Sequence, residues 1–162
     1  MDYEFTLIFK LPENQTDPES LIEQLGQAGC DDALIGSGMP GRLAFNFNRP
    51  AENAEQAIQS AIFDIQSVIP DATLIEAAPD FVGLTDVADL LGLSRQNMRK
   101  LMLNHPTFPD AVHTDRASLW HLAPLLDWLQ DKGRYPIPVQ TREIAQTTMR
   151  LNIAREMQRL AQ

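Results

Sequence analysis

Cysteine, aromatic residues and long apolar runs are all scarce in this sequence. It has one cysteine in 162 residues, and 7% of its residues are aromatic. The single thiol, Cys30, has no partner for an internal disulfide, so a reducing cytoplasm is the expected compartment. No apolar run reaches the roughly eighteen residues that a membrane-spanning helix needs, so no contact with a membrane is expected.

Positive charge is missing from the N-terminus, where a signal peptide needs it. Met1 is followed by Asp2 and Glu4, so export is not expected. The apolar share of 44% is that of an ordinary globular protein. The length allows one large domain or two small ones.

Basic residues are also scarce, but only in one half of the chain. Residues 1–80 hold three basic and 14 acidic residues, whereas residues 81–162 hold ten basic and eight acidic ones. The net charge of −9 therefore divides into −11 and +2. This asymmetry indicates two functions in one chain, and the acidic half should repel the phosphates of nucleic acids.

The acidic half shows a regular succession of apolar patterns. Strands are predicted at residues 3–9, 33–36, 42–48 and 73–78, and helices after Asp17 and over residues 53–68. The order strand, helix, strand, strand, helix, strand is the ferredoxin-like βαββαβ arrangement. We therefore predict an α+β protein in which residues 1–79 form an antiparallel sheet with two helices on one face.

The glycines and one acidic pair of this half could in principle form a functional site, but we expect both to be structural or surface features. Gly36, Gly38 and Gly41 lie in a predicted hairpin rather than before a helix, so they are interpreted as turn glycines and not as a phosphate cradle. The acidic pair at residues 31–32 has no visible carboxylate partner and is expected to be a solvated face.

Residues 82–101 predict two short helices joined by a tight turn. Gly92 can adopt the left-handed conformation that ends the first helix, and Ser94 can cap the second. Ala88 is expected where the two helices touch. A small core is predicted from apolar residues at helical spacing: Val87, Leu90, Leu91, Leu93, Met98 and Leu101.

The second of these helices places a polar and basic face toward solvent. This face consists of Arg95, Gln96, Asn97, Arg99 and Lys100. Arg and Lys suit guanine edges and phosphates, while Gln and Asn suit adenine edges, so the pattern favours a helix in the major groove of DNA.

At these residues the sequence resembles the winged helix-turn-helix of the excisionase, AlpA and MerR-like group. The resemblance continues through the segment 108–112 (Phe-Pro-Asp-Ala-Val), Trp120 and the closing helix at residues 126–129, and it covers about residues 82–130. It implies a winged helix-turn-helix domain at residues 80–135 that binds a specific site on double-stranded DNA.

The predicted DNA-binding residues combine this helix with the wing. Arg95, Gln96, Asn97 and Arg99 are candidates for base contacts, and Lys100 and Arg116 for phosphate contacts. Ser94 either caps the helix or binds a phosphate, and His113 of the wing either touches a phosphate or is a solvated surface residue. A wing hairpin is expected from residues 112–114 and 118–120.

Catalytic and metal-binding patterns are not apparent. His105, His113, His121 and Cys30 are scattered without the spacing of a zinc site, so no metal or other cofactor is expected. No Ser/His/Asp or Cys/His arrangement stands out, and an enzyme is the least supported class. The two tryptophans, at 120 and 128, are expected in the core.

The last segment, residues 139–162, predicts an amphipathic helix after a stiff link that contains Pro136 and Pro138. Thr141 is the expected cap, and one apolar stripe comprises Met149, Ile153, Met157 and Leu160. The stripe either mediates a homodimer or packs against the chain's own first domain. Dimerisation is the favoured reading, since winged helix-turn-helix proteins often bind two half-sites.

The sequence thus predicts a sequence-specific DNA-binding protein, most simply a transcriptional regulator. One alternative is an antitoxin-like protein whose acidic domain binds a partner protein and whose helix-turn-helix autoregulates. Two others are an excisionase-like factor that bends DNA and, by fold analogy alone, a ligand sensor.

Overall fold

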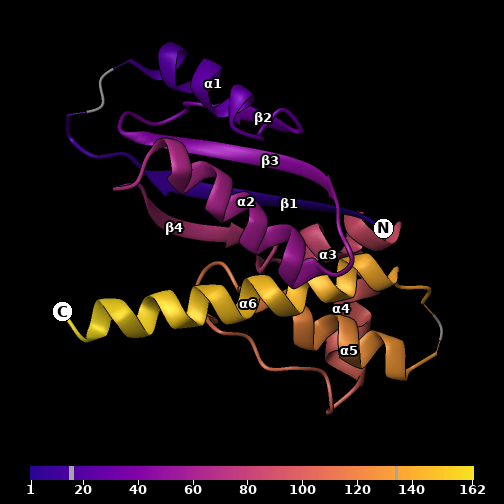
Figure 1. Cartoon of the computed structure of the whole chain (residues 1–162). Helices are drawn as coiled ribbons and strands as arrows, with labels where there is room; N and C mark the ends of the chain where they lie inside the picture. The colour runs from indigo at the N-terminus through magenta and orange to yellow at the C-terminus, as the bar shows by residue number, and fades with distance from the viewer. Residues whose placement is uncertain (15–16, 134) are drawn as a thin grey trace.

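A computed structural model describes residues 1–14, 17–133 and 135–162 and shows an α+β protein (Figure 1). Within these residues the chain forms six helices, a four-stranded sheet and a two-stranded sheet. The sheet and two helices occupy one part of the molecule, and three short helices occupy the other. The long C-terminal helix runs between the two parts.

The four-stranded sheet is antiparallel throughout. It comprises β1 (Asp2–Lys10), β2 (Ala33–Gly36), β3 (Arg42–Pro50) and β4 (Thr73–Ala78), in the order β2-β3-β1-β4. The predicted strands at 33–36 and 73–78 are confirmed to the residue, and the other two extend slightly beyond their predicted ends. In the central pair Phe5 lies opposite Phe47.

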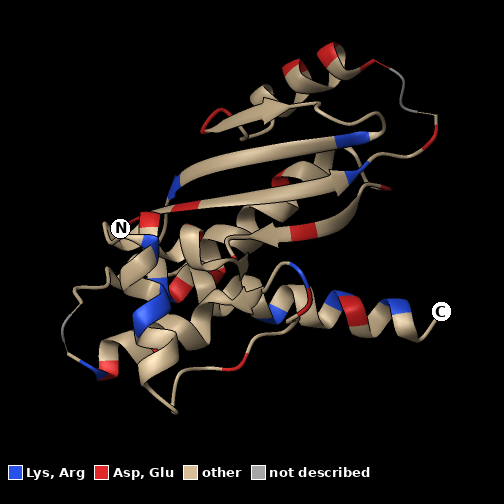
Figure 2. Ribbon diagram, turned by 180° about the vertical axis from the view of Figure 1, so that it is seen from behind, with Lys and Arg blue, Asp and Glu red and all other residues tan. Residues whose placement is uncertain are grey.

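One face of the sheet carries the first hydrophobic core. Alternation along β1 and β3 buries Phe5, Leu7, Phe9, Phe45 and Phe47 on that face. Helices α1 (Pro18–Gln27) and α2 (Ala54–Val68) cover it. Asp17 caps α1, and Asn53, the first residue of the predicted helix, is the cap of α2. Figure 2 shows the opposite face, which none of the helices in the described part of the chain covers.

A buried ion cluster holds β3 to the segment before β2, and it corrects one expectation. Arg49 donates to both carboxylate oxygens of Asp32, at 2.7 and 3.0 Å, and lies 3.0 Å from a carboxylate oxygen of Asp64. Asp32 is therefore a structural partner and not part of a solvated face. The hydrogen bonds that Arg49 donates to the Asp32 carboxylate raise the pKa of Arg49. Burial, reinforced by Asp64, raises the pKa of the nearby Cys30 thiol to about 11.

The second part has its own core beneath short elements. These are β5 (Phe81–Val82), α3 (Leu84–Leu91), α4 (Arg95–Asn104), β6 (Trp120–His121) and α5 (Leu122–Asp131). Strand β5 pairs with β6, so that Val82 lies opposite Trp120 and closes the segment into one unit.

The C-terminal helix α6 (Val139–Leu160) begins two residues before the predicted cap, Thr141. The chain's own two parts hold it: Arg142 pairs with Asp127 of α5 at 2.7 Å, and Glu143 accepts a 2.7 Å hydrogen bond from the Tyr3 hydroxyl of β1. That hydrogen bond raises the pKa of Tyr3 to about 12. None of the described helices is long and apolar enough to cross a membrane.

Asn152 fastens α6 to the edge of the sheet. Its side-chain amide accepts a hydrogen bond from the Ala77 backbone N–H at 2.9 Å and donates to the Ala77 carbonyl at 2.7 Å. It also donates to the buried carboxylate of Asp80 at 2.9 Å. At Ala77, Asn152 thus makes the two hydrogen bonds that a neighbouring strand would make at this open edge of β4.

We predict that Asn152→Leu lowers the free energy of unfolding by about 2–4 kcal/mol, because it leaves the Ala77 backbone groups without their side-chain partner and removes one of the two side-chain hydrogen bonds of the buried Asp80 carboxylate. Urea unfolding followed by circular dichroism measures this change. The control is Gln158→Leu on the exposed side of the same helix, which should change the free energy by no more than about 0.5 kcal/mol. Equal unfolding midpoints for the two variants would contradict the role given to Asn152.

Candidate nucleic-acid interface

The turn between α3 and α4 is the corner that the sequence predicts. Gly92 has φ 68° and ψ 28°, the left-handed conformation that glycine adopts without strain. Its N–H donates to the carbonyls of Ala88 and Asp89, and the Leu93 N–H donates to Ala88 at 2.8 Å. These bonds satisfy the last carbonyls of α3 and turn the chain into α4.

Helix α4 begins with a side-chain cap and is anchored by one buried residue. The Ser94 hydroxyl accepts a hydrogen bond from the Asn97 N–H at 3.1 Å, so capping is the role seen for Ser94. Met98 is fully buried and packs with Val87 and Ala88 of α3 in the second core. Ala88 is itself buried, as expected for a residue at the contact between the helices.

The remaining predicted residues of α4 lie on its outer surface. Arg95, Gln96, Asn97, Arg99 and Lys100 are all exposed. None of the three basic side chains forms an ion pair with another residue that the structure describes. Figure 2 shows basic segments on the helical part, whereas acidic segments gather around α1 at the far end of the sheet. The acidic half therefore does not cover this face.

The predicted core of the two helices is smaller than expected. Leu90 is 46% exposed, and Leu91, Leu93 and Leu101 are only half-buried. The reason is geometric: α3 has eight residues and packs against the core through Leu84, Val87 and Ala88. Helical spacing placed Leu90 on the apolar side, but the helix presents that position to solvent.

The wing is shorter than the predicted hairpin. Within the described residues a single bridge joins His113 to Leu119, and Trp120 pairs with β5 instead of completing the hairpin. Arg116 occupies the tip with φ 55°, an uncommon conformation for a residue with a side chain. His113 and Arg116 are both exposed, on a segment separate from α4.

Both tryptophans belong to the core, as predicted. Trp120 is buried and donates its indole N–H to the Pro109 carbonyl at 3.0 Å. Trp128 is half-buried and donates to the Thr107 hydroxyl at 3.0 Å. Phe108 packs edge-on against both rings. These contacts fix the loop between α4 and the wing.

A buried polar junction behind the wing escaped the sequence analysis. Asp80 is almost completely buried, and its carboxylate accepts hydrogen bonds from His121 Nδ1 at 2.8 Å and from Asn152. A carboxylate oxygen accepts hydrogen bonds, so this contact suits the tautomer of His121 that has its N–H at Nδ1. The one available signal was an acid directly at the predicted domain boundary.

Among the residues that the structure describes, no group of three or more His, Cys, Asp or Glu side chains could hold a metal ion. Comparisons of the chain with protein-family models, with curated proteins and with solved structures found no match.

We predict that Gly92→Ala destabilises the protein by about 1–2 kcal/mol, because a β-carbon is strained in the left-handed conformation. Gly36→Ala is the matched control, since Gly36 lies at the end of β2 with open space around it and no positive φ. Thermal unfolding of the two variants checks the difference. Equal midpoints would mean that the chain does not need this corner in the described conformation.

Proposed function

We propose that this protein binds a specific site on double-stranded DNA and acts as a transcriptional regulator. The observation that supports the proposal best is the outward face of α4, which presents three basic and two amide side chains, all exposed. Arg and amide side chains at the N-terminal end of a helix are the usual readers of base edges in the major groove.

The fold supports this proposal. A βαββαβ order with strands arranged β2-β3-β1-β4 is consistent with a ferredoxin-like domain, and a helical corner followed by a short bridged loop is consistent with a winged helix-turn-helix. In this assignment Arg95, Gln96, Asn97 and Arg99 read bases, and Lys100 and Arg116 contact phosphates.

Less of the stripe on α6 is available for a second copy than the sequence predicts. Met149 is half-buried against the chain's own second core, whereas Met157 and Leu160 are 62% and 81% exposed. The second core and the edge of the sheet thus bind α6 as far as Arg155, and the exposed end beyond it lines a hollow that is described below. We therefore leave dimerisation through this helix out of the proposed function.

A protein partner on the acidic domain is the second candidate function. Strand β2 is an edge strand, and its Leu34 side chain is 78% exposed beside Asp31. An uncovered edge with an apolar residue among acids suits the addition of a strand from a basic partner protein.

We predict that Arg95→Ala weakens binding to the preferred DNA site by about 1–3 kcal/mol and relaxes specificity at one base position. Lys100→Ala should weaken all sequences alike and reduce the slope of log K against log salt by about one unit. Fluorescence anisotropy over a range of salt concentrations measures both effects.

The DNA for this measurement comes from in vitro selection on a random pool, with Arg150→Ala as the control. Arg150 lies exposed on α6, so its removal changes the net charge equally without touching α4. Enrichment of a sequence that Arg95→Ala no longer prefers supports the proposal. Failure of the pool to enrich, or equal loss for Arg150→Ala, contradicts it.

A further inference from the structure

Two adjoining hollows lie where the sheet, the wing and α6 meet. One has a volume of about 580 Å³ and is mainly apolar, and the other has a volume of about 490 Å³ and is rich in charged side chains. They share four lining residues, namely Phe81, Asn152, Glu156 and Arg159. Both volumes fall in the range of small-molecule sites, which occur preferentially between domains.

The charged hollow contains two of the three basic residues of the acidic half. Lys10 of β1 and Arg42 of β3 lie directly opposite each other in the sheet register. Like charges in this position repel each other and destabilise a strand pair. In the part of the chain that the structure describes, neither side chain forms an ion pair with a carboxylate.

Helix α6 adds two further cations to the same hollow. Arg155 donates a 2.8 Å hydrogen bond from its Nε to the Leu74 carbonyl. Arg155 and Arg159 share one carboxylate, that of Glu156, at 3.1 and 3.0 Å. Glu156 and Glu76 are the acidic residues that line the hollow, so four cations face two carboxylates. A chain with net charge −9 thus presents a local excess of positive charge that is suited to an anion.

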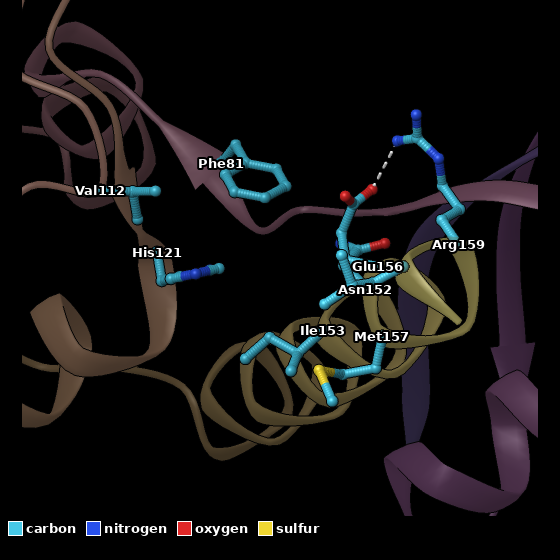
Figure 3. A pocket seen from close by; sticks show the side chains of 9 residues that line it. Phe81, Val112, His121, Asn152, Ile153, Glu156, Met157 and Arg159 are labelled. Carbon is cyan, nitrogen blue, oxygen red and sulfur yellow. Dashed lines mark hydrogen bonds and ion pairs between the residues drawn. The ribbon is translucent and has the colours of Figure 1, made fainter. Parts of the chain in front are cut away.

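The apolar hollow opens beside this cluster (Figure 3). Phe81 and His121 form one wall, with ring centroids 5.0 Å apart, and the bond to Asp80 fixes the orientation of His121. Ile153 and Met157 of α6 form the opposite wall. Figure 3 shows the ion pair between Glu156 and Arg159 on α6, and both residues also line the charged hollow.

We propose that the joined hollows bind a small amphipathic organic anion. Its apolar body lies between Phe81 and Ile153, and its carboxylate or phosphate group lies among Lys10, Arg42 and Arg159. An anion placed there relieves the repulsion between the opposed strand residues, while the apolar body leaves water. The charge complementarity favours this occupant over a second copy, because the chain itself is acidic.

The test uses a pair of fluorescent probes that differ in charge. 1-Anilinonaphthalene-8-sulfonate has an apolar body and an anionic group, and N-phenyl-1-naphthylamine has the same body without the anion. We expect the folded protein to bind one equivalent of the sulfonate more tightly than the amine. The triple variant Lys10→Gln/Arg42→Gln/Arg159→Gln should weaken sulfonate binding about tenfold, if each exposed charge contributes about 0.5 kcal/mol, and leave amine binding unchanged.

Two variants and one competition complete the experiment. Arg150→Gln removes a charge from α6 outside the hollows and should affect neither probe, whereas Ile153→Asp should weaken both. Circular dichroism and thermal unfolding verify that each variant is folded. Octanol, which lacks an anionic group, should not displace the sulfonate. Octanoate and octyl phosphate are then compared, and the one that displaces the sulfonate at the lower concentration shows whether the site prefers a carboxylate or a phosphate.

Three outcomes would overturn the proposal. The first is equal affinity for the two probes, and the second is sulfonate binding that the triple variant does not change. The third is binding that disappears as the protein concentration rises while the chain sediments as a dimer, since a second copy would then occupy the groove. None of these readouts depends on DNA, so a failure here is distinct from a failure of the proposed DNA binding.

Discussion

The side-chain amide of Asn152 is the contact on which the arrangement of the two halves depends. It occupies the open edge of β4 with one donor and one acceptor, and it also satisfies the buried carboxylate of Asp80. Without Asn152 the backbone groups of Ala77 would lie at an unpaired strand edge, which invites pairing with other chains, and the buried carboxylate of Asp80 would lose one of its two side-chain partners. A single polar residue of α6 therefore provides hydrogen-bond partners both for the edge of β4 and for the carboxylate of Asp80.

This contact explains why the proposed DNA-binding face is free. Helix α6 lies along the edge of the sheet, so the helical part is attached there and α4 is directed away from the acidic domain. Asp32 and Asp64 of that domain are engaged by Arg49, and further acidic segments lie on α1 at the far end of the sheet. A net charge of −9 is thus compatible with a locally basic face.

Local patterns in the sequence were sufficient to predict most elements, but not their junction. Strand alternation, the Ser94 cap and the left-handed Gly92 are properties of neighbouring residues, and the structure confirms them. The bond between Asn152 and Asp80 joins residues 72 positions apart, and the opposition of Lys10 and Arg42 follows only from the strand register. The exposure of Leu90 likewise depends on how far α3 reaches across its core, which periodicity does not specify.

The placement of α6 also determines what a ligand in the joined hollows could do. Asn152 and His121 line the apolar hollow and bind Asp80, so the site includes the residues that fix the two halves relative to each other. Occupancy changes the arrangement of the halves only if the ligand binds one arrangement more tightly than another. Arg155 and Arg159 belong to α6, whereas Lys10 and Arg42 belong to the sheet, so an anion held by both sets favours the closed contact between helix and sheet. We therefore expect such a ligand to make the junction between α6 and the sheet more rigid. It would thereby also restrict the orientation of α4 relative to the acidic domain.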